Sequence, residues 1–287
     1  MSKLVTLFAL ALSSLLSFAG IYRHDRPKGR YIDLAHKRQF DCVGEVWAGK
    51  SKRGSCVLIG KTFVLSAAHV FFNDKTNPDK QFYCAFNGVK YPVKKIINHT
   101  RYSELGEYDI SILELNEPIE DISPAALCAT HDELGADVTG VGFGSICRVD
   151  SPSEFVAKVA VDKNTAGKLA GENVIDSIGG YSVYKIRAIL YCDFDSPPGC
   201  KYSDQSDKMG SSIPKDLEYY VNGGDSGGGL FRQTAKGWEL VGICSGGGVN
   251  LNQFEKTYYY GHIMKWTRVS AFISWIQECE QNTTTTK

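Results

Sequence analysis

The chain has 287 residues, of which 43% are hydrophobic, which is enough for one large domain or two modest ones. Its 32 basic and 32 acidic residues balance, and this removes the electrostatic case for binding nucleic acid or an anionic membrane. The 29 glycines and many short apolar runs favour strands and turns over long helices, so we expect an all-β protein.

The beginning of the chain is typical of a secretory signal peptide. Lys3 supplies a positive charge, an apolar run extends from Leu4 to Leu16, and small residues precede a cleavage site after Ala19. The alternative is a membrane anchor, but the run is short for a bilayer span. We therefore expect residues 1–19 to be removed and the protein to be secreted, in an extracellular or periplasmic location, with no integral membrane segment left.

Short apolar runs separated by polar turns follow between residues 40 and 115, a pattern typical of a small antiparallel barrel. The clearest runs are Val57–Ile59, Thr62–Leu65 and Ile110–Leu113. A polar stretch from Cys128 to Ala136 is the expected crossing to a second barrel. The strands expected there are Val138–Phe143, Phe155–Val161, Tyr184–Tyr191, Gly229–Phe231 and Leu240–Cys244.

One helix is predicted close to the end of the chain, over residues 269–278. Val269, Phe272, Ile273 and Ile276 recur at the i, i+3, i+4 and i+7 positions of a helix with one apolar face. A polar tail, residues 280–287, follows it.

Three separated segments supply the groups for nucleophilic catalysis. Ser226 lies in the glycine-rich segment 223–229, where small neighbours let a substrate approach and let backbone N–H groups turn toward a reacting carbonyl. His69 and Asp109 each adjoin an apolar run, and a histidine can take the serine proton while an acid orients the imidazole. Taken alone, Ser226 is better explained as a turn residue, His69 as the end of a strand and Asp109 as a surface carboxylate. Together, their chain order of His, Asp and Ser indicates one site.

With these flanks, the segments resemble the trypsin-like serine peptidases of the chymotrypsin family (peptidase family S1). The resemblance runs from about Phe40 to Glu278 and includes the closing segment Trp266–Ile276. It implies two packed six-stranded antiparallel Greek-key barrels with a C-terminal α-helix. The expected division is a signal peptide (1–19), an activation segment (20–39), and a peptidase domain (40–279) with barrels at about 40–127 and 137–265.

The resemblance also assigns roles at the site. Ser226 is the expected nucleophile, His69 its base and Asp109 the acid that orients the imidazole. The N–H groups of Gly224 and Ser226 are the expected oxyanion hole. Asp225 matches the carboxylate that, in the family, pairs with an N-terminal amine freed on activation.

Two residues are candidates for that N-terminus. Ile21 lies just after the expected signal cleavage site, and Tyr31 follows the basic Arg30, which would imply a zymogen. Neither reproduces the usual activated start of the family. Ile21 is favoured because an isoleucine amine fits an apolar slot best.

Substrate recognition is assigned to two segments. Ser245, Gly246 and Gly247 match the strand that pairs with the substrate backbone, where glycines leave room for a side chain. Tyr220 stands at the pocket-floor position, where trypsins carry an aspartate, so cleavage after Lys or Arg is not expected. A small or apolar residue before the scissile bond is predicted instead.

Nine cysteines follow the expected signal peptide, and in an exported protein some should pair, leaving at least one over. Cys192 and Cys200 flank a turn-forming loop and are the first candidates for a bridge. Their spacing fits no zinc signature, so no metal is expected. Val70 and Asn222 stand where vertebrate trypsins carry half-cystines, so the connectivity of the family does not transfer.

The predicted function is that of a secreted serine endopeptidase, a monomer that needs no cofactor and acts on protein or peptide substrates through an acyl-enzyme. The alternative is a catalytically silent binding protein that keeps the peptidase fold. A peptidase dedicated to one host protein would share the chemistry and differ only in its substrate.

Overall fold

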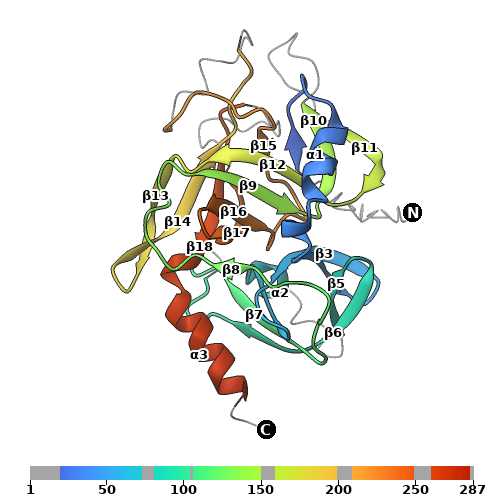
Figure 1. Ribbon diagram of the computed structural model, residues 1–287, viewed down its shortest axis with the longest axis vertical. Coiled ribbons are helices and arrows are strands. Elements are labelled where there is room, and N and C mark those ends of the chain that lie inside the picture. The colour runs from blue at the N-terminus through green and yellow to red at the C-terminus, as the bar shows by residue number, and fades with distance from the viewer. Residues whose placement is uncertain are drawn as a thin grey trace, which may run out of the picture.

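The computed structural model describes residues 20–72, 81–103, 106–149, 159–198, 209–248 and 260–284. Strands dominate the described residues, and the prediction of a mostly β fold is confirmed. Figure 1 shows two β-rich halves, one above the other, with helices at the periphery. No helix in these ranges combines the length and the apolar character needed to cross a bilayer.

The first half is a closed antiparallel barrel in the order β2-β3-β4-β7-β6-β5. Apolar residues of paired strands meet inside it, as where Leu65 lies opposite Ile112, both fully buried. A short helix, α2 (His69–Phe72), follows β4 directly. The strands are β2 (Val43–Ala48), β3 (Ser51–Leu58), β4 (Phe63–Ser66), β5 (Phe82–Phe86), β6 (Val89–Asn98) and β7 (Ser111–Leu115).

The second half is an eight-stranded sheet with a main path of β12-β9-β16-β17-β18-β14-β13, to which β8 adds by pairing with β17. The prediction gave this half six strands: β14 overlaps the strand expected at Tyr184–Tyr191, whereas its hairpin partner β13 was not expected. Of the strand expected at 155–161, residues 155–158 lie outside the described residues. The strands are β8 (Ala126–Leu127), β9 (Asp137–Gly142), β12 (Leu169–Val174), β13 (Ser177–Val183), β14 (Ile186–Asp193), β16 (Gly229–Thr234), β17 (Gly237–Gly248) and β18 (Ile263–Arg268).

The N-terminal segment forms elements that the sequence patterns did not indicate. Strand β1 (Ile21–Tyr22) pairs with β10 (Ser145–Val149) on one side and with β15 (Tyr219–Tyr220) on the other. The resulting sheet has the order β11-β10-β1-β15, with β11 spanning Val159–Ala166. Helix α1 (Lys28–Ala35) then packs against β12, and a short 3-10 turn, η1 (Arg38–Phe40), leads into the first barrel.

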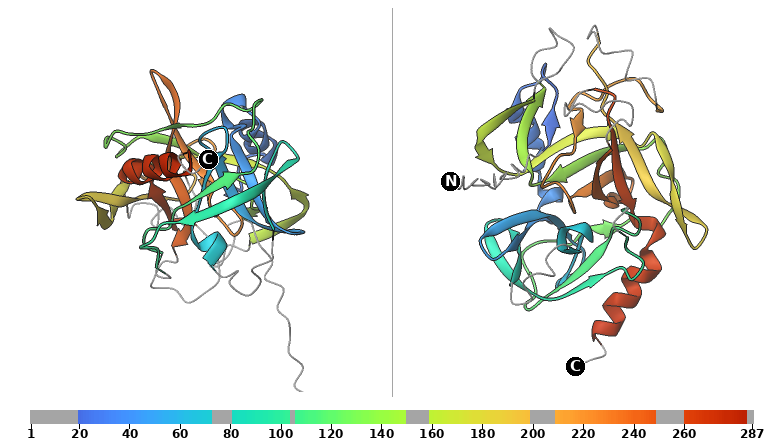
Figure 2. Two further views of the ribbon diagram at one scale, coloured as in Figure 1. Left: turned by 90° about the horizontal axis from the view of Figure 1, so that it is seen from below. Right: turned by 180° about the vertical axis from the view of Figure 1, so that it is seen from behind.

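The predicted C-terminal helix is present with altered bounds. A 3-10 turn, η4 (Val269–Ala271), precedes α3 (Ile273–Thr284), and the helix extends six residues further than expected. The predicted apolar face is buried at Phe272 and Ile276. Helix α3 leaves the second half and runs beside the first barrel in both back and front views (Figures 1 and 2), so it links the two halves.

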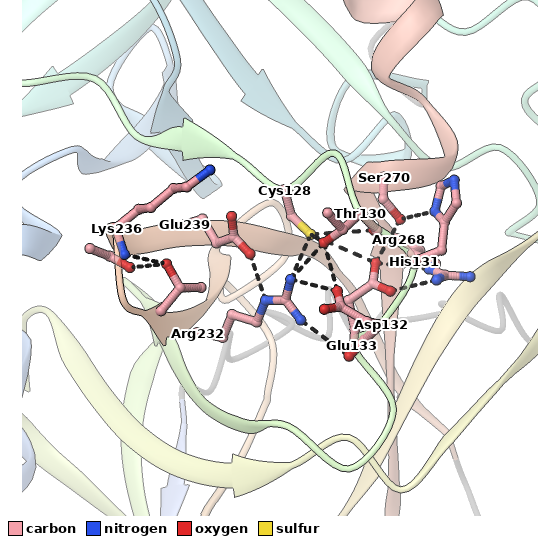
Figure 3. Close-up of polar contacts among 12 residues, drawn as sticks. Cys128, Thr130, His131, Asp132, Glu133, Arg232, Lys236, Glu239, Arg268 and Ser270 are labelled. Carbon is pink, nitrogen blue, oxygen red and sulfur yellow. Dashed lines mark hydrogen bonds and ion pairs between the residues drawn. The ribbon is translucent and has the colours of Figure 1, made fainter.

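The crossing between the halves is held by a polar network (Figure 3). Glu133 in this connection is fully buried, and both its oxygens accept hydrogen bonds from Arg268 at the end of β18, with Ser270 donating at 2.6 Å. Burial raises the pKa of Glu133, but these hydrogen bonds outweigh it and hold the pKa below its usual value. Arg232 binds the same connection through Asp132 and pairs with Glu239 of β17.

We expect Arg268→Ala to destabilise the protein by about 3–5 kcal/mol, because it leaves the buried Glu133 carboxylate without its cation. Urea unfolding at neutral pH measures this. The matched control is Lys61→Ala, which removes the partner of Glu120 in a pair whose side chains are 66% and 63% exposed, and its cost should stay below about 1 kcal/mol. Equal effects of the two substitutions would contradict a special role for the buried pair.

Candidate active site

His69, Asp109 and Ser226 are brought together between the two halves. His69 begins α2, Asp109 precedes β7, and Ser226 lies in the turn before β16. The imidazole Nε2 of His69 lies 2.7 Å from the Ser226 hydroxyl oxygen, and its Nδ1 lies 2.8 Å from a carboxylate oxygen of Asp109. The three side chains form one hydrogen-bonded chain from the hydroxyl to the carboxylate.

Asp109 is the most enclosed of the three, with 1% of its surface exposed. Beside the His69 ring, its carboxylate accepts the backbone N–H of His69 at 2.9 Å and the hydroxyl of Ser245 at 2.6 Å. Thr267 of β18 donates to its backbone carbonyl at 2.9 Å. A carboxylate removed from water needs such donors, so the contacts from both halves fix its position.

The turn at Ser226 is packed tightly on the first barrel. The carbonyl of Ser226 accepts the N–H of Ser55 at 2.8 Å. Gly227 has φ +85°, and a Cβ there would lie 2.2 Å from both the Ser55 carbonyl and the Ser66 hydroxyl. Only glycine allows this approach. The glycines around Ser226 indicated a tight turn, but nothing in the sequence indicated Ser55 and Ser66 as the groups packed against it.

Gly224, the expected oxyanion donor, is anchored by the same serine. Its carbonyl accepts the Ser55 hydroxyl at 2.9 Å, and that hydroxyl accepts the N–H of Phe143 at 2.9 Å. Gly224 has φ +98°, a conformation open to glycine. Ser55 was not identified from the sequence, because nothing in its local pattern sets it apart.

Asp225 is buried and accepts the N–H groups of Gly144 and Asn222, each at 3.1 Å. The Tyr219 hydroxyl lies beside its carboxyl group. Burial raises the pKa of Asp225 to about 6, although Tyr219 and the two N–H groups partly counteract this. A cation placed beside this buried carboxyl group would stabilise its ionised form.

The two candidate N-termini, Ile21 and Tyr31, lie in different surroundings, and Gly20, the first residue after the expected cleavage site, lies beside Ile21. Gly20 lies against the Tyr219 ring, so closely that a Cβ there would lie 2.9 Å from the Tyr219 hydroxyl. Ile21 is fully buried and pairs with Tyr220. Tyr31 is also fully buried, but inside α1, where its hydroxyl donates to the carbonyl of Glu218 at 3.1 Å.

The residues assigned to substrate binding also lie together. Ser245, Gly246 and Gly247 are in β17, and Gly246 has φ +146°. Tyr220 is 2% exposed, and a Cβ on Gly247 would lie only 2.2 Å from its hydroxyl. Gly247 in turn lies opposite Met264 of β18, whose sulfur accepts the N–H of Val221 at 3.4 Å. Tyr220 and Met264 therefore fill the space behind this part of β17.

Known proteins place the chain among peptidases. A family model described as Trypsin matches residues 34–176. Serine protease SSP1 of Scolopendra subspinipes is 25% identical over 247 residues, covering 81% of this chain and 73% of that protein. The chain belongs to the trypsin-like serine peptidases.

Other relatives are matched over shorter stretches. Atrial natriuretic peptide-converting enzyme is 39% identical over 103 residues in human and 28% identical over 164 residues in mouse. These matches cover 30% and 42% of this chain, and the chain spans only 10% and 15% of those longer proteins.

The fold comparison agrees. The solved structure of mouse neuropsin, a serine protease expressed in the limbic system, matches with a TM-score of 0.55 at 17% identity. The match covers 85% of this chain and 96% of that one. The predicted chymotrypsin-like architecture is thereby confirmed.

The cysteines differ from the expectation of disulfides. Among the described residues, six buried cysteines are recorded as free thiols: Cys42, Cys56, Cys84, Cys128, Cys192 and Cys244. Cys200 lies outside the described residues, but Cys192, its expected partner, is a free thiol, so the predicted bridge between them is not confirmed. Within the same ranges, no group of three His, Cys, Asp or Glu side chains is arranged to hold a metal ion.

In a chain extended by one residue before Gly20, no N-terminal amine is held at Gly20 near Asp225. We expect such a chain to lose stability as the pH rises from about 4 to 6. The folded protein keeps the Asp225 proton up to about pH 6, whereas the unfolded chain releases it near 3.8, so ionisation costs the folded state up to about 3 kcal/mol. Urea unfolding across this pH range, compared with Asp225→Asn, measures the difference. Parallel curves for the two proteins would contradict it.

Proposed function

We propose that the protein is a secreted serine endopeptidase, active as a monomer, that hydrolyses peptide bonds of protein substrates through an acyl-enzyme. The observation that carries this proposal is the continuous hydrogen-bonded chain from the Ser226 hydroxyl through His69 to the buried Asp109. Family membership supports the proteolytic class, and the chain order and spacing support these three residues.

In the proposed reaction, the Ser226 oxygen attacks the carbonyl carbon of the scissile bond while Nε2 of His69 takes its proton. The negative oxygen that forms accepts hydrogen bonds from the N–H groups of Gly224 and Ser226. His69 then donates the proton to the leaving amine, which departs and leaves Ser226 acylated. A water molecule, deprotonated by His69, hydrolyses the ester and restores the hydroxyl.

Asp109 holds the Nδ1–H of His69 and stabilises the imidazolium formed in each half of the reaction. Ser245 supports this role, because its hydroxyl donates to the same carboxylate oxygen that faces His69. The Asp109 carboxylate is therefore held in place while the imidazole changes charge.

For the activating N-terminus, we favour a start at Gly20 or Ile21 over a start at Tyr31. An amine at Gly20 would lie next to Tyr219 and thus near Asp225, the buried carboxyl group that gains from a cation. Cleavage before Tyr31 would instead cut α1 and release a strand paired on both sides. A chain that starts at Gly20 with a free amine should therefore lose the pH dependence described for Asp225.

For specificity, we propose that the substrate presents a small residue before the scissile bond. Tyr220 occupies the pocket-floor position of the family, and its hydroxyl reaches Gly247 of the proposed substrate strand. Met264 fills the adjoining space. A side chain much larger than a methyl group would have to displace the Tyr220 ring.

The same filled pocket favours the rival function, a binding protein with the peptidase fold and no turnover. In that case Tyr220 excludes substrate altogether. The two functions make different predictions for covalent labelling of Ser226.

We expect the wild-type protein to cleave a diverse peptide library and to be labelled at Ser226 by a serine-directed phosphonate. Ser226→Ala should lose both activities, falling at least about 10⁴-fold because the nucleophile is absent. Mass spectrometry identifies the cleaved bonds, the labelled residue and the N-terminus of the active protein. Labelling without cleavage would favour a blocked substrate pocket, and the absence of both in a folded protein that starts at Gly20 would favour the binding protein.

We expect Tyr220→Gly to extend cleavage to aromatic or long aliphatic residues, because removing the ring opens the space next to Gly247. The gain should be about tenfold or more in kcat/KM for such substrates, while small residues are cleaved no faster. A gain of activity cannot result from unfolding. Tyr184→Gly, which removes a tyrosine that is 78% exposed, is the control and should leave the profile unchanged. An unchanged profile in Tyr220→Gly would refute the filled-pocket explanation.

A further inference from the structure

The backbone immediately before Asp109 adopts a conformation that its sequence does not favour. Tyr108 has φ +53°, in the left-handed region where a bulky residue is an outlier. The next residues form a tight turn, in which the N–H of Ile110 donates to the carbonyl of Tyr108 at 2.8 Å. Such a conformation persists only where the surroundings hold it.

The hydrogen bond that holds Tyr108 comes from the other half of the molecule. Its backbone N–H donates to the phenolic oxygen of Tyr181 at 2.5 Å. Tyr181 lies in β13, whereas Tyr108 precedes β7 of the first barrel. The Tyr108 hydroxyl returns a longer contact to the carbonyl of Ser182 at 3.4 Å.

Packing around the Tyr108 ring fixes it further. The ring centroids of Tyr108 and Tyr181 are 4.4 Å apart, and the His99 ring stacks on Tyr108 at 4.8 Å with 20° between the planes. The Arg101 guanidinium lies 4.3 Å from the ring centroid, and Phe272 meets its edge. The ring is thus enclosed by residues of both halves, and among the contacts described only Tyr181 accepts the backbone N–H of Tyr108.

We propose that Tyr181 is a positioning residue for Asp109: it holds the Tyr108 peptide in its left-handed conformation and thereby aims the Asp109 carboxylate at His69. The effect of this role on turnover rests on the proposed peptidase function. The contacts on the Asp109 carboxylate itself, from His69 and Ser245, stabilise the charge. Tyr181 instead fixes the backbone conformation before Asp109, and with it the direction in which the Asp109 side chain points.

The test is Tyr181→Phe, which keeps the stacked ring and removes the oxygen that accepts the Tyr108 N–H. We expect kcat to fall about tenfold to a hundredfold, because a small misplacement of a group near the reaction is costly, while KM stays within about twofold. Tyr184→Phe, on the exposed end of the same hairpin, is the matched control and should leave kcat unchanged. Equal kcat values for wild type and Tyr181→Phe would overturn the proposal.

A second pair of variants separates positioning from a general loss of folding. Gly adopts φ +53° without strain, so in a Tyr108→Gly background the further loss caused by Tyr181→Phe should shrink to less than about threefold. If Tyr181→Phe lowers kcat as much in this background as in the wild type, Tyr181 does not act through the Tyr108 conformation and the proposal fails.

A spectroscopic measurement keeps the test independent of turnover. The proton between Nδ1 of His69 and Asp109 can be followed by NMR, and Tyr181→Phe should speed its exchange with water about tenfold or more relative to Tyr184→Phe. If wild type cleaves no peptide, the proposed function fails, and this exchange rate still decides the role of Tyr181. Equal exchange in the two variants would contradict that role.

Discussion

A buried carboxylate sets the geometry on which the rest of the site depends. Asp109 lies between the two halves with 1% of its surface exposed, and burying such a charge without donors would cost far more than a domain can spare. The donors come from α2, from Ser245 in β17 and, for the backbone, from Thr267 in β18. Satisfying this one group therefore requires both sheets to be in place, which ties assembly of the site to assembly of the fold.

The Ser226 turn is constrained by close packing rather than by the need to satisfy a buried charge. Gly227 and Gly228 approach backbone carbonyls of both halves so closely that a Cβ would lie 2.2 Å from Ser55 and 2.5 Å from Val141. The Ser55 hydroxyl then donates to the carbonyl of Gly224. The N–H of Ser226 belongs to the same short turn, so its position is fixed together with that of Gly224. Close packing thus positions the proposed nucleophile, while hydrogen bonding positions the proposed acid.

The sequence predicted the parts of this arrangement that leave a local trace. Short apolar runs indicated β3, β4, β7, β9, β14, β16 and β17, the glycines around Ser226 indicated a tight turn, and the i, i+3, i+4 and i+7 pattern indicated α3. What it did not indicate depends on partners distant in the chain: Ser55, Tyr181 and the two-residue strand β1 have no distinctive flanks. Helix α1 was missed for a related reason, because its stability comes from packing Tyr31 and Leu34 on the second sheet rather than from a strong amphipathic pattern.

The thiols show how such a fold can do without some of the expected bridges. Gly54 packs beside Val70, one of the positions where vertebrate trypsins carry a half-cystine, and a Cβ on Gly54 would lie 3.2 Å from the valine methyl group. Burial raises the pKa of Cys42 to about 12 and that of Cys279 to about 11, and it raises the pKa of Cys192 and Cys244 well above the usual value. Since the thiolate is the reactive form, these groups resist both oxidation and exchange. The junction between the halves relies instead on Glu133 with Arg268 and on the aromatic contacts of Tyr108, which need no oxidising environment to form.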